Sequence, residues 1–226
     1  MRIIAAFQKN KEISYTSHLD VQRTLQRAFR RADLPLAYSK GFNPHPKLSF
    51  ATALATGYTS AGEWFEVELD QDLEPTAFKD RVNAALPNGM RIVESFEADD
   101  GIDTLSKLIR AAHYELTVHF DTPVSPNAIF EAVRSIMGPD PVIVEKKTKS
   151  GVRPADIRPD ILEASVKECS DSTAIIDVVG SLTAAGGLRA ETFVRALLDR
   201  LHLNGYFTAH RISLCFEGSD RLPRLR

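Results

Sequence analysis

The 226-residue sequence has only two cysteines, too few to hold a chain of this size together by disulfides. No stretch approaches the roughly 20 apolar residues that a membrane-spanning helix needs, and the apolar run at the N-terminus is too short for a signal peptide. Charge of one sign is also missing, since 28 Lys and Arg stand against 30 Asp and Glu for a net charge of −2. We therefore expect a cytoplasmic protein with no membrane contact. Taken alone, the near-neutral total argues against nucleic acid as a ligand.

The charge is unevenly distributed along the chain. Residues 17–50 carry six bases against two acids, for a net charge of +4, whereas residues 60–100 carry eleven acids against three bases, for −8. A local patch, more than the total, sets the field that an anionic ligand meets at close range. The remaining composition, 43% hydrophobic and 26% charged, is typical of a globular protein with a core.

Hydrophobic periodicity predicts the same order of elements twice. The first half is expected to form strand 1–7, helix 17–32, strands 48–55 and 62–70, helix 75–86 and strand 90–96. In the second half we expect strand 113–120, a helix from Ser125 to Gly138, a long basic loop, hairpin 163–179, a helix 189–203 stopped by Gly205, and strand 207–216. The order βαββαβ is that of a ferredoxin-like domain. The sequence therefore predicts an α+β fold of two tandem ferredoxin-like domains, 1–100 and 107–218, with a linker near 97–106 and a basic tail at 219–226.

The first predicted helix begins with the motif Ser17-His18-Leu19-Asp20. It fits a capping box, in which Ser17 accepts a backbone amide and Asp20 reaches back to the cap. His18 then occupies the first helical position, where the positive end of the helix lowers the pKa of an imidazole. A neutral histidine there is either a base or ligand, or an ordinary surface residue.

The least generic stretch, residues 38–50, reads YSKGFNPHPKLSF. Its glycine, asparagine and prolines forbid regular structure and stiffen a loop. Two aromatics, Tyr38 and Phe42, lie among Lys40, His45 and Lys47, which is the combination that stacks on unpaired bases and meets phosphates. The alternative is a stiff connector whose aromatics are buried.

Further basic residues point to the same kind of ligand. Arginines recur along one face of helix 17–32, opposite its apolar face, and the basic segment 146–160 is long enough to be functional. The residues that we assign to a nucleic-acid contact are Arg23, Arg27, Arg30, Arg31, Tyr38, Lys40, Phe42, Asn43, His45, Lys47, Lys147, Arg153 and Arg158. Gly186-Gly187 lacks the lysine and hydroxyl of a P-loop, so we interpret it as a flexible turn.

Metal and nucleophile motifs are weak. No pair of cysteines or histidines has the spacing of a zinc site. His18, Asp20 and His45 are candidate catalytic residues, and they converge only if the proline-rich loop folds back over the start of the first helix. We expect no metal and no cofactor.

The combination YTSHLDVQRTLQRAFRRADLPLAYSKGFNPHPKLSF resembles the signature of the radical-SAM-associated (radical-SAM-linked) proteins of the DUF2344 type. The matching positions are 17–20, 27–31 and 37–50, supported by 62–69 and, more loosely, by 152–159. Lys40 stands where that family commonly has glutamine. The resemblance spans essentially the whole chain and is most specific in its first half.

The resemblance implies a partner of a radical SAM enzyme with a cobalamin-type domain. This chain has no C-x-x-x-C-x-x-C triad, so it cannot hold the iron–sulfur cluster of such chemistry. Our leading interpretation is a non-catalytic protein that binds rRNA or tRNA and presents it as substrate. One alternative is a metal-independent endoribonuclease resembling CRISPR repeat-processing enzymes, with His18 or His45 as general base. Another is a protein scaffold whose acidic face, including Glu66 and Glu68, docks the radical SAM partner.

Overall fold

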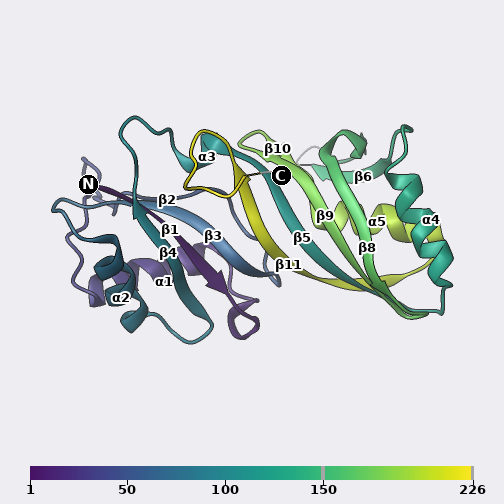
Figure 1. The fold of residues 1–226 in the computed structure, drawn as a ribbon, viewed down its shortest axis with the longest axis horizontal. Coiled ribbons are helices and arrows are strands. Elements are labelled where there is room, and N and C mark those ends of the chain that lie inside the picture. Colours follow the sequence, from purple (N-terminus) through teal and green to yellow (C-terminus); the bar gives the residue numbers. More distant parts are fainter. Residues whose placement is uncertain (149–150, 225–226) are drawn as a thin grey trace. The chain divides into compact units, whose positions relative to one another are not determined.

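The computed structural model describes residues 1–148 and 151–224, and for residues 147 and 148 the backbone alone. The chain forms two compact units (Figure 1). Unit 1 comprises Met1–Ile109 and Ser213–Arg226, and unit 2 comprises Arg110–Ile212. Both contain helices and strands, so the protein is a mixed α/β protein, with five α-helices in the described residues. None of these helices is long and apolar enough to span a membrane.

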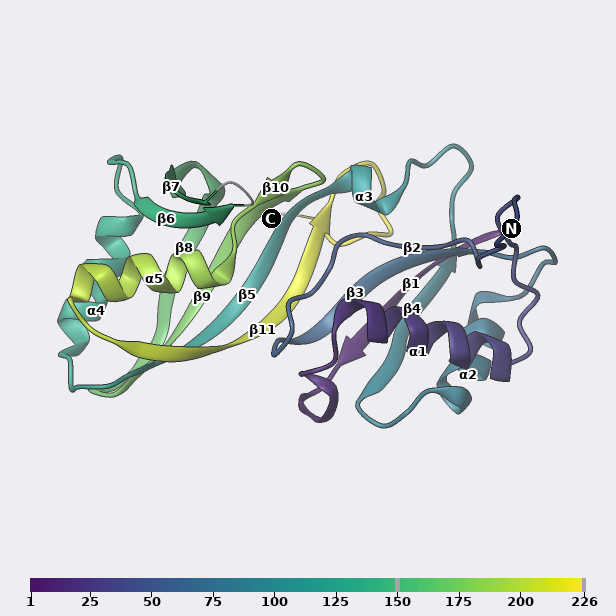
Figure 2. The ribbon, with the colours of Figure 1, turned by 180° about the vertical axis from the view of Figure 1, so that it is seen from behind.

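Unit 1 is an antiparallel sheet covered by two long helices on one face (Figure 2). Its strands follow the spatial order β2-β3-β1-β4. Its elements are β1 Arg2–Lys9, a 3-10 turn Lys11–Ile13, α1 His18–Arg31, β2 Leu48–Phe50, β3 Thr59–Glu68, α2 Pro75–Ala85, β4 Met90–Glu97 and α3 Leu105–Leu108.

Helix α1 forms as the sequence predicts. Ser17 is its N-cap, with the Ser17 side chain accepting the Asp20 amide at 3.2 Å, and Ala32 is its C-cap. Four apolar side chains at helical spacing enter the core of unit 1, where they meet alternate residues of β1 and β3. They are Val21, Leu25, Ala28 and Phe29. The arginines between them are left on the opposite, exposed face.

Unit 2 is built around strand β9, which pairs antiparallel with β5 and, on its other side, with β8. Its two long helices lie on one face of this sheet, as Figures 1 and 2 show from opposite sides. Its elements are β5 Ile109–Phe120, α4 Pro126–Ile136, β6 Ile143–Thr148, β7 Gly151–Asp156, a 3-10 turn Arg158–Asp160, β8 Ile161–Cys169, β9 Thr173–Thr183, β10 Gly186–Gly187, α5 Ala190–Leu201 and β11 Gly205–Phe216.

Several predictions about elements are wrong. The expected long basic loop is largely an antiparallel hairpin of β6 and β7. The strand expected at 48–55 ends at Phe50. Helix α5 ends at Leu201 and is capped by His202, in the left-handed region with φ +54°, so Gly205 is not the residue that stops it. Gly205 lies at the start of β11, where a Cβ atom would come 2.2 Å from the His119 carbonyl oxygen.

The end of the chain does not follow the predicted boundary at residue 218. Residues 213–216, the last part of β11, belong to unit 1, where Phe216 packs edge-on against Trp64 with ring centroids 6.1 Å apart. Because Trp64 lies on the face of β3 opposite Phe65, this contact covers the sheet on its second side. Strand β3 is therefore buried on both faces, whereas its alternation predicts one solvated face.

Candidate nucleic-acid interface

Residues 38–46, which we call the finger, fold back on themselves as a narrow loop. Tyr38 and Pro46 form a β-bridge at its base. The Ser39 amide donates to the His45 carbonyl at 2.8 Å, and the His45 amide donates to Ser39 Oγ at 3.0 Å. Gly41 turns the tip with φ +134°, which only glycine adopts readily. The finger is thus held by its own hydrogen bonds.

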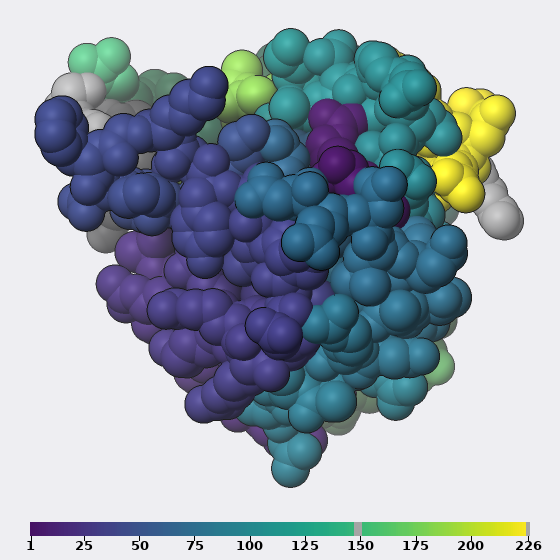
Figure 3. All heavy atoms as spheres, turned by 90° about the vertical axis from the view of Figure 1, so that its left-hand side faces the viewer, coloured from purple at the N-terminus to yellow at the C-terminus, as the bar shows by residue number. Residues whose placement is uncertain are grey.

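The finger presents its aromatics to solvent. Phe42 is fully exposed at the tip, and Tyr38 is 45% exposed at the base. Lys40, Asn43 and His45 are also exposed. Figure 3 shows this dark blue segment projecting from the surface of unit 1. The alternative of a connector with buried aromatics is therefore wrong for Phe42.

A groove of about 310 Å³ lies at the base of the finger. One wall comes from the finger and β2, and the other from β1 and β3. Each of its two carboxylates accepts a hydrogen bond: Lys47 donates to Glu68 Oε2 at 2.5 Å, and Ser49 donates to Glu66 Oε1 at 2.9 Å. The groove residues are Arg2, Ser39, His45, Pro46, Lys47, Leu48, Ser49, Glu66, Val67, Glu68 and Thr104.

The arginine face of α1 lies apart from this groove. Helix α1 packs on the sheet face that bears Phe65 and Val67, and successive strand residues point to opposite faces. Glu66 and Glu68 therefore put the groove on the other face. Among the residues that the structure describes, the arginines have local partners alone: Arg23 bonds Asp20 at 3.3 Å, Arg27 bonds Thr24 Oγ1, and Arg30 bonds the Gln26 carbonyl. Arg31 is exposed beside them.

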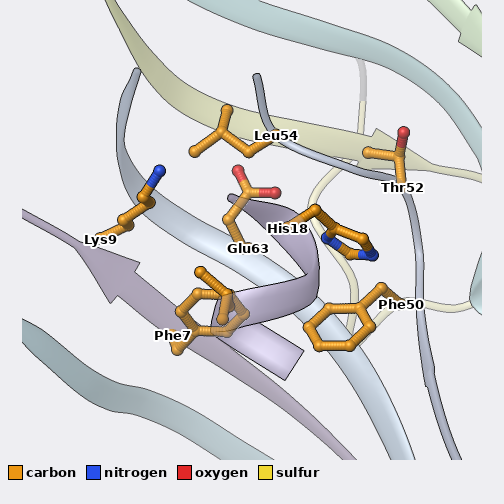
Figure 4. Close-up of a pocket in the computed structure, with 8 residues that line it drawn as sticks. Phe7, Lys9, His18, Phe50, Thr52, Leu54 and Glu63 are labelled. Atoms are coloured by element: carbon orange, nitrogen blue, oxygen red, sulfur yellow. The ribbon is translucent and has the colours of Figure 1, made fainter. Parts of the chain in front are cut away.

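His18 occupies a different pocket, on the helix-covered face (Figure 4). Its ring packs edge-on against Phe50 with centroids 4.8 Å apart. The same pocket contains Glu63 and Lys9, both almost fully buried. Lys9 Nζ donates to the Ser14 carbonyl at 2.7 Å and the Thr16 carbonyl at 3.1 Å. The cavity of about 10 Å³ has room for about one water molecule, so no substrate fits beside His18.

Burial shifts the pKa values of two side chains in this pocket. It lowers the pKa of His18, the direction that the sequence predicts, through desolvation of the imidazole ring. Burial also lowers the pKa of Lys9, against the opposing attraction of Glu63. At the helix start, the Ser17 hydroxyl donates to Asp20 at 2.7 Å and lowers the pKa of that carboxyl, with help from Arg23.

The three candidate catalytic residues do not converge. His18 lies in the pocket under α1, whereas His45 lines the groove on the opposite sheet face. Asp20 is exposed on α1 and is bound to Ser17 and Arg23. Across residues 1–148 and 151–224, no group of three or more His, Cys, Asp or Glu side chains could hold a metal ion.

The basic residues of unit 2 that we assign to a nucleic-acid contact differ in their exposure and hydrogen bonding. Arg153 is exposed on β7, and the side chain of Lys147 lies outside the described part of the structure. Arg158 is also assigned to a nucleic-acid contact, but in the structure its guanidinium donates to the carbonyls of Gly138, Met137 and Ile161 at 2.7–3.0 Å. Arg158 therefore caps the end of α4.

Sequence reasoning also missed the charged residues inside the sheet. Glu66 is 6% exposed, so it cannot belong to an acidic docking face. Arg2 lines the groove together with Glu66 and is absent from the predicted site residues. The available signal was the position of these charges within otherwise apolar strands, where a buried charge needs a partner.

The family model described as "Uncharacterized protein conserved in bacteria (DUF2344)" matches residues 2–189. The chain belongs to this family. No curated protein matches the sequence.

Three solved structures resemble the fold. A Cbf5–Nop10–Gar1 complex matches with a TM-score of 0.58 at 11% identity, over 99% of this chain and 52% of that one. An H/ACA RNP bound to a substrate RNA containing 2′-deoxyuridine matches with a TM-score of 0.52 at 10% identity, over 93% and 46%. An archaeal box H/ACA sRNP Nop10–Cbf5 complex gives 0.51 at 10%, over 92% and 46%. The DUF2344 chain thus spans about half the length of these structures, and such low identity supports similarity of fold alone.

Proposed function

We propose that this protein binds single-stranded regions of RNA, in rRNA or tRNA, through the finger of unit 1. The observation that carries the proposal is the fully exposed Phe42 at the tip of a loop stiffened by its own hydrogen bonds. An exposed aromatic ring costs free energy in water, and stacking on an unpaired base removes it from solvent. Because the loop is already ordered, little conformational entropy is lost on binding.

Basic side chains around Phe42 supply the contacts to phosphate. Lys40 is next to the turn at Gly41, and its side chain has no hydrogen bond or ion pair within the described residues. The same holds for Arg31, which lies at the end of α1 and not beside Phe42. The arginine face of α1 is a second basic surface, on the other side of the unit 1 sheet. The H/ACA RNP of similar fold is bound to a substrate RNA, which agrees with an RNA ligand.

The family resemblance leads to a more specific proposal about the fold and the protein partner. We propose that units 1 and 2 are two ferredoxin-like domains, and that the protein presents RNA to a radical SAM enzyme with a cobalamin-type domain. The strand order β2-β3-β1-β4 of unit 1 supports the first part. The second part rests on the resemblance and on the absence of a cluster-binding cysteine triad from the sequence.

A salt titration tests RNA binding. The full chain is mixed with a fluorescent single-stranded RNA, and anisotropy gives the dissociation constant from 50 to 300 mM KCl. We expect log K to fall linearly with log [KCl], with a slope of about −2 if three phosphates are neutralised at roughly 0.7 per phosphate. A flat plot, or no binding at 50 mM KCl, would contradict the proposal.

A further inference from the structure

The groove at the base of the finger contains carboxylate side chains as well as basic side chains. A phosphate ligand would require the basic side chains alone. Glu66 and Glu68 line it together with Arg2 and Lys47. Two carboxylates repel a phosphate, so their presence calls for a ligand that donates hydrogen bonds. The groove volume of about 310 Å³ is at the lower end of small-ligand pockets, which suits one nucleotide.

The two carboxylates differ in how far their hydrogen bonding is satisfied. Glu66 is more than nine-tenths buried, and its Oε2 accepts no hydrogen bond within the described residues. Arg2 Nη1 lies 3.7 Å from that oxygen, which is too long for a hydrogen bond, and another nitrogen of Arg2 donates to the Ile102 carbonyl at 2.7 Å. Glu68 is half-exposed and uses one oxygen, Oε2, to bind Lys47. No other residue in the described part of the chain bonds its Oε1, which leaves that oxygen to a ligand in the groove.

Lys47 and Glu68 together place a donor and an acceptor side by side. A ribonucleotide offers the complement: a 2′-hydroxyl that donates and a neighbouring phosphate that accepts. A carboxylate that accepts from a ribose hydroxyl is a recurring mode of nucleotide recognition, and the 2′-hydroxyl is what distinguishes RNA from DNA at a protein site.

We propose that this groove binds one ribonucleotide next to the base stacked on Phe42, with Glu68 accepting a hydrogen bond from the ribose 2′-hydroxyl. The inference rests on the proposed RNA binding and adds selectivity for RNA over DNA. Deoxyribose cannot make this hydrogen bond, so it leaves Glu68 Oε1 facing the strand without a donor.

The test compares RNA and deoxyuridine-containing DNA of one sequence, by anisotropy at a single salt concentration. Wild type is expected to bind RNA about tenfold more tightly, the effect of one hydrogen bond to a charged group. Glu68→Ala is expected to bring the two affinities within about twofold, chiefly by improving DNA binding, because Lys47 is then free for phosphate. Glu74→Ala, which removes an exposed acid at the start of α2, is the matched control and should keep the tenfold preference.

The outcomes separate the two claims. RNA binding without preference over DNA, or a preference unchanged in Glu68→Ala, would overturn the assignment of the groove and leave the finger proposal intact. Absence of RNA binding would overturn both. Emission from Trp64, the sole tryptophan, reports the fold of the Glu68→Ala variant, because that buried ring lies four residues before Glu68 on the same strand and the same sheet face.

Discussion

At the scale of single residues, the motif SHLD predicts the N-cap of α1 but does not predict the surroundings of His18. Ser17 caps α1 as the sequence predicts. His18 is shielded by Phe50 of β2 and by residues of β1 and β3. The helix start is visible in the sequence because capping is a local interaction. The pocket is not, because its residues come from positions 7 to 63.

The half-buried His18 predicts a specific dependence of stability on pH. Its folded-state pKa is lowered, so as the pH falls below about 6.5 the unfolded chain takes up a proton before the folded chain does. Stability is therefore lost on acidification until the pH reaches the folded pKa. His18→Gln is expected to lose less stability than wild type between pH 7.5 and pH 5.5, measured by urea unfolding at both values. Equal losses in the two proteins would contradict this account.

At the scale of elements, the helices and the long strands are where periodicity places them, to within a few residues. The hairpin of β6 and β7 could not be predicted in this way, because β7 is exposed at nearly every position and has no alternation. The finger was predictable as an irregular loop from its glycine and prolines. Its exposure was not, because the same composition suits a buried connector.

Strand β11 provides an element-scale prediction at Gly205. A side chain there would collide with the backbone of β5 at His119, so the strands would have to separate. Gly205→Ala is expected to lower the free energy of unfolding by about 2 kcal/mol, measured by urea denaturation. Gly62→Ala is the control, because a Cβ atom at Gly62 meets nothing within 4 Å, and it should leave stability unchanged or slightly raised. A neutral effect at Gly205 would show that the close approach to β5 is not required.

At the scale of the whole molecule, the sequence predicts two consecutive domains with one boundary. In the structure the chain begins in unit 1, forms unit 2 and then returns to unit 1. The return of residues 213–226 to unit 1 depends on contacts such as Phe216 with Trp64, 152 positions apart in the chain. No local pattern encodes a contact of that range. Packing also separates residues that are close in sequence. Within segment 17–50, which has a net charge of +4, α1 lies on one face of the unit 1 sheet and the groove at the base of the finger lies on the other.

The central claim is that Phe42 stacks on RNA, and a pair of phenylalanine variants tests it most directly. Phe42→Ala removes the exposed ring at the finger tip, and Phe130→Ala removes another exposed ring, on α4 of unit 2. Affinity for a single-stranded RNA is measured by anisotropy for wild type and both variants at one salt concentration. We predict that Phe42→Ala weakens binding about tenfold, as expected for one lost stacking contact of roughly 1–3 kcal/mol, while Phe130→Ala leaves it unchanged. Equal affinities of Phe42→Ala and wild type would contradict the account.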